Sequence, residues 1–140
     1  MNIRNYVDSD YDQLMALYDQ SDSYGGQRDD NRDSREKIQN MIAQDPESII
    51  VADDGGKIVG TVSLIENGRV AWLFRFAALK SENETHILGL LQMKASGIFK
   101  SRGHNQMLVY SPAGNADLNN RYEALHFNKG NDYSAFWQNI

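Results

Sequence analysis

Cysteine is absent from this chain of 140 residues, and proline occurs only twice. Without cysteine there is no disulfide, no thiolate nucleophile and no cysteine-type zinc site. Acidic residues outnumber basic ones and the formal net charge is −5, whereas binding to nucleic-acid phosphates needs clustered lysine and arginine. No stretch is apolar for long enough to cross a membrane, and residues 1–10 lack the apolar core of a secretion signal. We therefore expect a cytoplasmic protein that binds neither nucleic acid nor membrane.

What the chain does contain is typical of one ordinary globular domain. Apolar residues make up 41% and charged residues 24%, which is the usual balance for a protein with a packed core and a solvated surface. A chain of this length can bury one such core. Because it shows no internal repeat and no low-complexity run, we predict a single domain spanning residues 1–140.

The most apolar stretch is residues 70–79, which carries a single charge at Arg75. Such a strand is usually buried on both faces at the centre of a sheet. Residues 81–84 then open a run whose apolar members recur at helical spacing, and residues 107–110 predict a second strand after Gly103. Strand, helix and strand at this spacing predict a right-handed crossover between parallel strands. A ligand is expected where the central strand ends and the helix begins.

Further strands are predicted before this crossover, in antiparallel order. Residues 2–7, 48–52 and 58–65 have the composition of strands. Turn signals at residues 53–56 and 67–68 close two hairpins, so that the central strand is the last strand of a meander.

Three more helices are predicted from their capping side chains. The carboxyl and hydroxyl groups of residues 8–10 can cap one helix, which has an apolar face. Asp33 with Glu36 resembles a capping box before a second helix, and Asn115 caps a third helix. The aromatic residues 133–138 predict a short closing strand.

The order of elements, with parallel pairing at one place only, is similar to that of the GNAT superfamily of acyl-CoA N-acyltransferases. Residues 115–127 follow the N-x-x-A-x-x-x-Y-E-x-L-G-F pattern of that family in register, with Leu118 at the usual alanine and His126 at the usual glycine. Residues 51–60 look like its strand, turn and glycine-ended strand. The resemblance implies an α/β (α+β) fold: a mixed, mostly antiparallel sheet of about six to seven strands, about four helices, and one parallel β-α-β crossover at the cofactor site.

The resemblance also implies acetyl-CoA as co-substrate and assigns residues to it. The pantetheine arm would pair with the backbone of Ala77, Ala78 and Leu79. Tyr122 would protonate the leaving thiolate, because that leaving group gains from a nearby O–H donor, and Asn115 would contact the cofactor. The alternative interpretation is that Tyr122 is a core aromatic and that Asn115 is a helix cap only.

The phosphate loop departs from the family pattern. Where the family has Q/R-x-x-G-x-G/A, with glycines that let backbone N–H groups reach a pyrophosphate, residues 83–88 have neither glycine. The shifted frame of residues 86–91 recovers one, at Gly89. The candidate phosphate-binding residues in these two frames are Thr85, His86, Ile87, Leu88 and Gly89.

The protein's own side chains compete for the same place. Ser81 and Glu84 have the spacing of a capping box, which would satisfy the donors that a pyrophosphate needs. Glu82 and Glu84 would also repel an anion. Three basic residues can supply positive charge to a phosphate instead: Lys80, Lys94 and Arg121.

The residues that would bind and activate the acceptor amine are less clearly indicated by the sequence. Glu66, just before the central strand, is the candidate general base, and a surface turn residue is the alternative. The acid-rich residues 22–36 would suit a cationic amine or simply form a solvated loop. His86, His104 and His126 lack ligand spacing, so we predict no metal site.

Two functional hypotheses remain open. In the first, the protein is an N-acetyltransferase in which a primary amine of a small molecule or peptide attacks acetyl-CoA directly in a ternary complex. In the second, a non-catalytic binding or regulatory protein has kept the fold and lost the cofactor. A homodimer formed through an edge strand near residues 133–137 is compatible with either.

Overall fold

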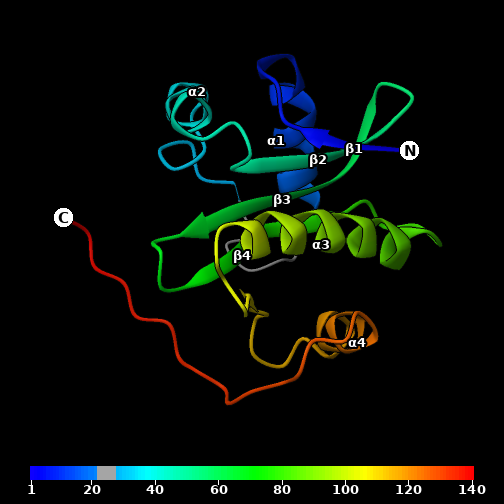
Figure 1. Ribbon diagram of the computed structural model, residues 1–140, viewed down its shortest axis with the longest axis vertical. Helices are drawn as coiled ribbons and strands as arrows, with labels where there is room; N and C mark the ends of the chain where they lie inside the picture. The colour runs from blue at the N-terminus through cyan, green and yellow to red at the C-terminus, as the bar shows by residue number, and fades with distance from the viewer. Residues whose placement is uncertain (22–27) are drawn as a thin grey trace.

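A five-stranded sheet forms the centre of the computed structural model, which describes residues 1–21 and 28–140 (Figure 1). Its strands are β1 (Asn2–Asn5), β2 (Ile49–Asp54), β3 (Lys57–Glu66), β4 (Ala71–Ala78) and β5 (Leu108–Val109). They lie in sequence order, antiparallel from β1 to β4, and β5 pairs parallel to β4. The predicted meander and the parallel crossover are therefore confirmed, with slightly fewer strands than the six to seven expected.

Four α-helices cover the two faces of the sheet in the described part of the chain. They are α1 (Tyr11–Gln20), α2 (Arg35–Gln44), α3 (Glu84–Ser101) and α4 (Ala116–Ala124), and a 3-10 turn at Asp8–Asp10 precedes α1. In Figure 1, α1 and α2 lie on one side of the strands, and α3 and α4 lie on the other.

Strand β2 shows how the sequence separates the two cores. Side chains alternate between the faces of a strand. Ile50 and Ala52 accordingly join the cluster under α3 and α4, and Ile49 and Val51 join the cluster under α1 and α2. All four side chains are buried, which explains why this strand lacks the polar alternation of a half-exposed one.

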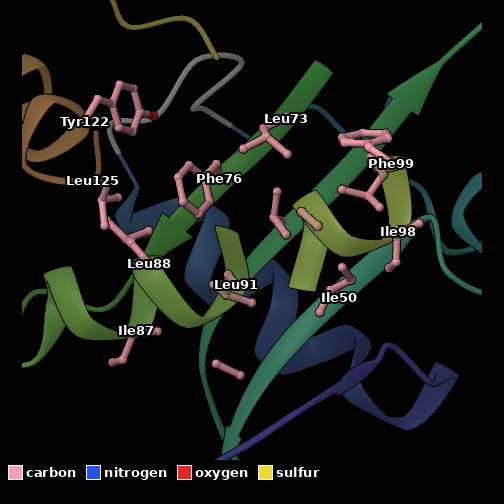
Figure 2. Packing of buried hydrophobic residues seen from close by; sticks show 14 of the residues in the cluster. Ile50, Leu73, Phe76, Ile87, Leu88, Leu91, Ile98, Phe99, Tyr122 and Leu125 are labelled. Atoms are coloured by element: carbon pink, nitrogen blue, oxygen red, sulfur yellow. The ribbon is translucent and has the colours of Figure 1, made fainter. Parts of the chain in front are cut away.

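Gly60 of β3 sits at the closest approach between the sheet and α3. A Cβ atom added there would lie 2.6 Å from Ile87 Cγ2 and 3.0 Å from Leu91 Cδ1. Both contacted side chains are buried members of the larger core, where a shift of one displaces its neighbours (Figure 2). The absence of a side chain at Gly60 therefore sets how near α3 lies to the strands.

One predicted helix cap is wrong, and another acts one turn earlier than predicted. The cap of α2 is Ser34, whose Oγ accepts from the Lys37 N–H at 3.3 Å, and not Asp33. Asp10 makes no capping bond to α1. Its carboxylate accepts from the Val7 N–H at 3.0 Å in the preceding 3-10 turn, and from the Arg4 guanidinium at 2.7 and 2.9 Å. In both cases an arginine elsewhere in the fold is the carboxylate's partner.

The predicted closing strand at residues 133–138 is also wrong. Residues 128–140 have no regular secondary structure, and Figure 1 shows this red segment leading away from α4. Phe136 and Trp137 are 94% and 84% exposed. The aromatic pattern predicts a strand, but a strand also needs a neighbour to hydrogen-bond, and within the described residues the segment has none.

Gly60→Ala should lower the free energy of unfolding by about 1–3 kcal/mol, because the added methyl group overpacks the contact with Ile87 and Leu91. Urea denaturation followed by circular dichroism measures this change. The matched control is Gly97→Ala on the exposed face of α3, where an added Cβ meets nothing within 4 Å. That variant should be neutral or gain about 0.5–1 kcal/mol from helix propensity. Equal effects of the two substitutions would contradict the close-approach explanation.

Candidate functional site

The carboxyl end of β4 has one open backbone edge. The Leu79 N–H donates to the Val59 carbonyl at 2.8 Å, on the β3 side. Because backbone groups alternate along a strand, the N–H and carbonyl of Ala78 point to the opposite side. There β5 pairs only with Trp72 and Leu73, so that no strand in the described chain covers the rest of that edge. Of the three residues predicted to pair with an extended amide, Ala78 directs its backbone groups to this open edge, whereas Leu79 directs its N–H to β3 and Ala77 pairs with Thr61 of β3.

Tyr122 of α4 lies against the same end of β4. It is buried, and its ring stacks on Phe76 with the centroids 5.9 Å apart and the planes 11° apart. Phe127 packs on Tyr122 at a tilt, 5.8 Å away. Figure 2 shows Tyr122 of α4, and Leu125 just after that helix, on the side of Phe76. The structure therefore places Tyr122 beside the end of β4 that carries the predicted backbone residues Ala77 and Ala78.

A small cavity joins the three elements at this place. Its lining includes Ala77 and Ala78 of β4, Glu84 and Leu88 of α3, and Arg121 of α4. Its volume is about 10 Å³, roughly the space of one water molecule. A larger ligand enters only if some lining side chain moves.

The predicted capping box at the start of α3 is wrong. Asn83 is the N-cap and makes no side-chain capping bond. The Ser81 Oγ accepts from the Asn83 N–H at 3.2 Å, and the Glu84 carboxylate accepts from the Arg121 guanidinium of α4. Glu84 is therefore used to join two helices and not to close its own first turn.

The first turn of α3 retains donors for an anion. The Ile87 N–H donates to the Asn83 carbonyl at 3.0 Å, but no described group accepts from the N–H of Thr85 or His86. Both residues are exposed, and the helix dipole favours negative charge at this end.

The other candidate phosphate residues lie deeper in the helix. Ile87 and Leu88 are buried in the larger core, and Gly89 is half-buried with Leu125 3.5 Å from where its Cβ would be. The frame of residues 83–88 therefore places donors at the helix end, and the shifted frame does not.

Asn115 has the geometry of a helix cap. Its Oδ1 accepts from the Leu118 N–H at 3.0 Å at the start of α4. This capping role fixes the first turn of the helix that carries Tyr122.

Glu66 lies at the other end of β4, paired with Ala71 in the hairpin. Its carboxylate accepts from Arg102 at 2.6 Å and contacts His104 Nε2 at 2.5 Å. The Arg102 hydrogen bond lowers the pKa of Glu66. This position, far along the strand from Ala78, gives no support to a role as general base.

A buried ion pair that the sequence analysis did not identify lies on the other face of β4. Arg75 is 1% exposed, and its Nη2 donates to Asp33 Oδ2 at 2.6 Å. The guanidinium lies 4.7 Å from the Tyr18 ring centroid, and burial lowers its pKa. Its φ of +53° coincides with a register shift against Thr61 and Ser63. The signal in the sequence is the lone charge in an otherwise apolar strand.

The acidic region at residues 22–36 is in part outside the described residues, Asp22 included. In the described part, Asp29 and Asp30 pair with the neighbouring arginines Arg32 and Arg28 at 3.9 and 3.4 Å. These pairs are those of a solvated loop.

Residues 1–21 and 28–140 contain no group of three acidic or histidine side chains arranged to hold a metal ion. No helix in those residues has both the length and the apolar character needed to cross a bilayer.

Comparison with solved structures identifies the fold. A transcriptional regulator from Bacillus halodurans C-125 matches with a TM-score of 0.77 at 18% identity, over 98% of this chain and 99% of its own. The aminoglycoside 6'-N-acetyltransferase AAC(6')-Ih from Acinetobacter baumannii matches with a TM-score of 0.75 at 17% identity, over 99% and 98%. The PaiA N-acetyltransferase from Thermoplasma acidophilum, solved in complex with coenzyme A, matches with a TM-score of 0.71 at 21% identity, over 88% and 86%.

The protein has the GNAT N-acetyltransferase fold that its sequence pattern predicts. A further match, from Pyrococcus horikoshii, is longer, and this chain spans 42% of its length. No protein-family model and no curated protein matches the sequence.

Asp33→Asn should destabilise the protein by about 3 kcal/mol, because it removes the carboxylate charge that pairs with the buried Arg75 guanidinium. Urea denaturation at neutral pH measures the loss. Asp30→Asn is the control, since its ion pair with Arg28 is exposed and should contribute less than about 0.5 kcal/mol. A loss for Asp33→Asn as small as that of the control would show that the buried pair does not hold the loop to β4.

Proposed function

We propose that the protein is an N-acetyltransferase that moves an acetyl group from acetyl-CoA to a primary amine. The observation that supports this most directly is the open backbone edge at Ala78 with Tyr122 packed beside it, at the end of β4. The same fold occurs in N-acetyltransferases, one of them solved with coenzyme A.

The site has groups suited to each part of the co-substrate. The Ala78 N–H and carbonyl can hydrogen-bond the extended amides of the pantetheine arm, as a neighbouring strand would. The N–H groups of Thr85 and His86 can bind phosphate oxygens at the positive end of α3.

Acetyl-CoA supplies an activated thioester, and the chain's own groups handle charge and protons around it. The amine nitrogen attacks the carbonyl carbon, an N–C bond forms and the C–S bond breaks. A backbone N–H on the edge of β4 stabilises the negative charge that develops on the carbonyl oxygen. The Tyr122 O–H donates its proton to the leaving sulfur. The surplus proton of the amine passes to water, and water returns a proton to the tyrosinate.

The acceptor class proposed is a small-molecule or peptide primary amine. An aminoglycoside 6'-N-acetyltransferase with the same fold is named for such an amine. In this chain the Arg75–Asp33 pair joins the residue just before the cap of α2 to β4.

Acetyl-CoA should bind the purified protein with a dissociation constant in the micromolar range, measured by titration calorimetry. Desulfo-CoA should bind with similar affinity, because the phosphates and the pantetheine arm provide the contacts, and this control excludes thiol artefacts. An absence of heat at millimolar co-substrate would overturn the proposal and favour a non-catalytic protein that has kept the fold.

Tyr122→Phe should reduce kcat by about 100-fold or more, because the leaving sulfur loses its proton donor, while acetyl-CoA affinity stays unchanged. The assay measures free CoA thiol released with an amine acceptor found by screening polyamines, aminoglycosides and lysine peptides. Tyr133→Phe is the matched control, since Tyr133 is 75% exposed on the C-terminal segment and should behave as wild type. Unchanged turnover in Tyr122→Phe would remove Tyr122 from the chemistry.

A further inference from the structure

An ion pair lines the cavity at the end of β4. The Arg121 guanidinium of α4 donates to the Glu84 carboxylate of α3, and both side chains line the cavity together with Ala77 and Ala78. The side chains of Glu84 and Arg121 are 16% and 17% exposed, so the pair is shielded but remains in contact with solvent. The pair thus lies beside the end of β4 that carries Ala78.

Arg121 pairs with a carboxylate of its own chain, at a place where the other charged groups would attract an anion from solution. A guanidinium binds carboxylates and phosphates with the same fork of N–H donors. Lys80 lines the same cavity, and the N–H groups of Thr85 and His86 lie one and two residues after Glu84. Glu84 therefore contributes the only negative side chain to the described lining of a site whose other charged members are positive.

We propose that Arg121 is the phosphate-binding residue for the co-substrate, and that Glu84 occupies it as an autoinhibitory carboxylate until a CoA phosphate takes its place. The inference rests on the proposed function. It assigns to a side chain on α4 the positive charge that the phosphate loop lacks.

The exchange replaces one ion pair with another and needs no change in the strands. A phosphate brings more negative charge to Arg121 than a carboxylate does. The released Glu84 side chain is within reach of water, so its desolvation cost is recovered. Part of the binding energy of the phosphate is used to displace Glu84. The affinity for CoA is therefore lower than that of the same site without a carboxylate at position 84.

The test compares CoA binding by calorimetry in two charge-matched variants. Glu84→Gln removes the competing carboxylate and should raise CoA affinity by about three- to tenfold. Glu82→Gln removes the same charge two residues earlier, from an exposed side chain that has no contact with Arg121, and should change affinity less than about twofold. Thermal melting of each variant checks that the fold is retained.

Two further arms identify the group that is bound. Arg121→Gln should weaken CoA binding by about tenfold or more. Acetyl-pantetheine, which has no phosphate, should bind wild type, Glu84→Gln and Arg121→Gln with affinities that differ much less than those for CoA. A difference for acetyl-pantetheine as large as that for CoA would overturn the phosphate assignment.

The outcomes separate this inference from the proposed function. If wild type and Glu84→Gln bind CoA equally well, the autoinhibitory role of Glu84 is wrong and the proposed function stands. If Glu82→Gln and Glu84→Gln gain equally, the effect is general repulsion, and the specific exchange is overturned. If wild type and Glu84→Gln both fail to bind CoA at millimolar concentration, the inference and the proposed function fail together.

Discussion

The arrangement of the site depends on the contact between α3 and the sheet at Gly60. Because Gly60 has no side chain, Ile87 and Leu91 pack directly on β3. This contact brings the first turn of α3 level with the end of β4, where Ala78 has its open edge. A helix displaced outward by one methyl group would carry its donors away from that edge. The spacing between helix and strand thus sets the position of the backbone groups on which the proposed chemistry relies.

The overall topology was predictable because it follows from periodicity and turn chemistry. The apolar run ending at Leu79, the helical spacing after it and the turn residues at 53–56 and 67–68 are local signals, and each specifies its element without knowledge of the rest of the fold. The place of Tyr122 on a helix after the crossover was predictable from the motif around it. Its packing on Phe76 follows once α4 is placed over the core.

Partners of charged side chains were not predictable in the same way. Ser81 and Glu84 have the spacing of a capping box, yet Glu84 pairs with Arg121, and Asp33 pairs with Arg75 in place of capping α2. A local capping bond to an N–H competes with a charge-assisted bond to a guanidinium, and the stronger bond prevails when the fold brings the arginine near. That proximity is tertiary information. The same limit explains residues 133–138, whose composition suits a strand that finds no neighbour in the described chain.

The charged contacts of α3 differ between its two ends. At its carboxyl end, Arg102 donates to Asp45, Glu47 and Glu66, whereas at its amino end the described ion pair joins Glu84 to Arg121. Ile87 and Leu91 hold the amino-terminal half of the helix on β3 at Gly60. When the Glu84–Arg121 pair opens, two side chains are therefore expected to move while the helix stays in place, so that access to the site requires no change in the backbone.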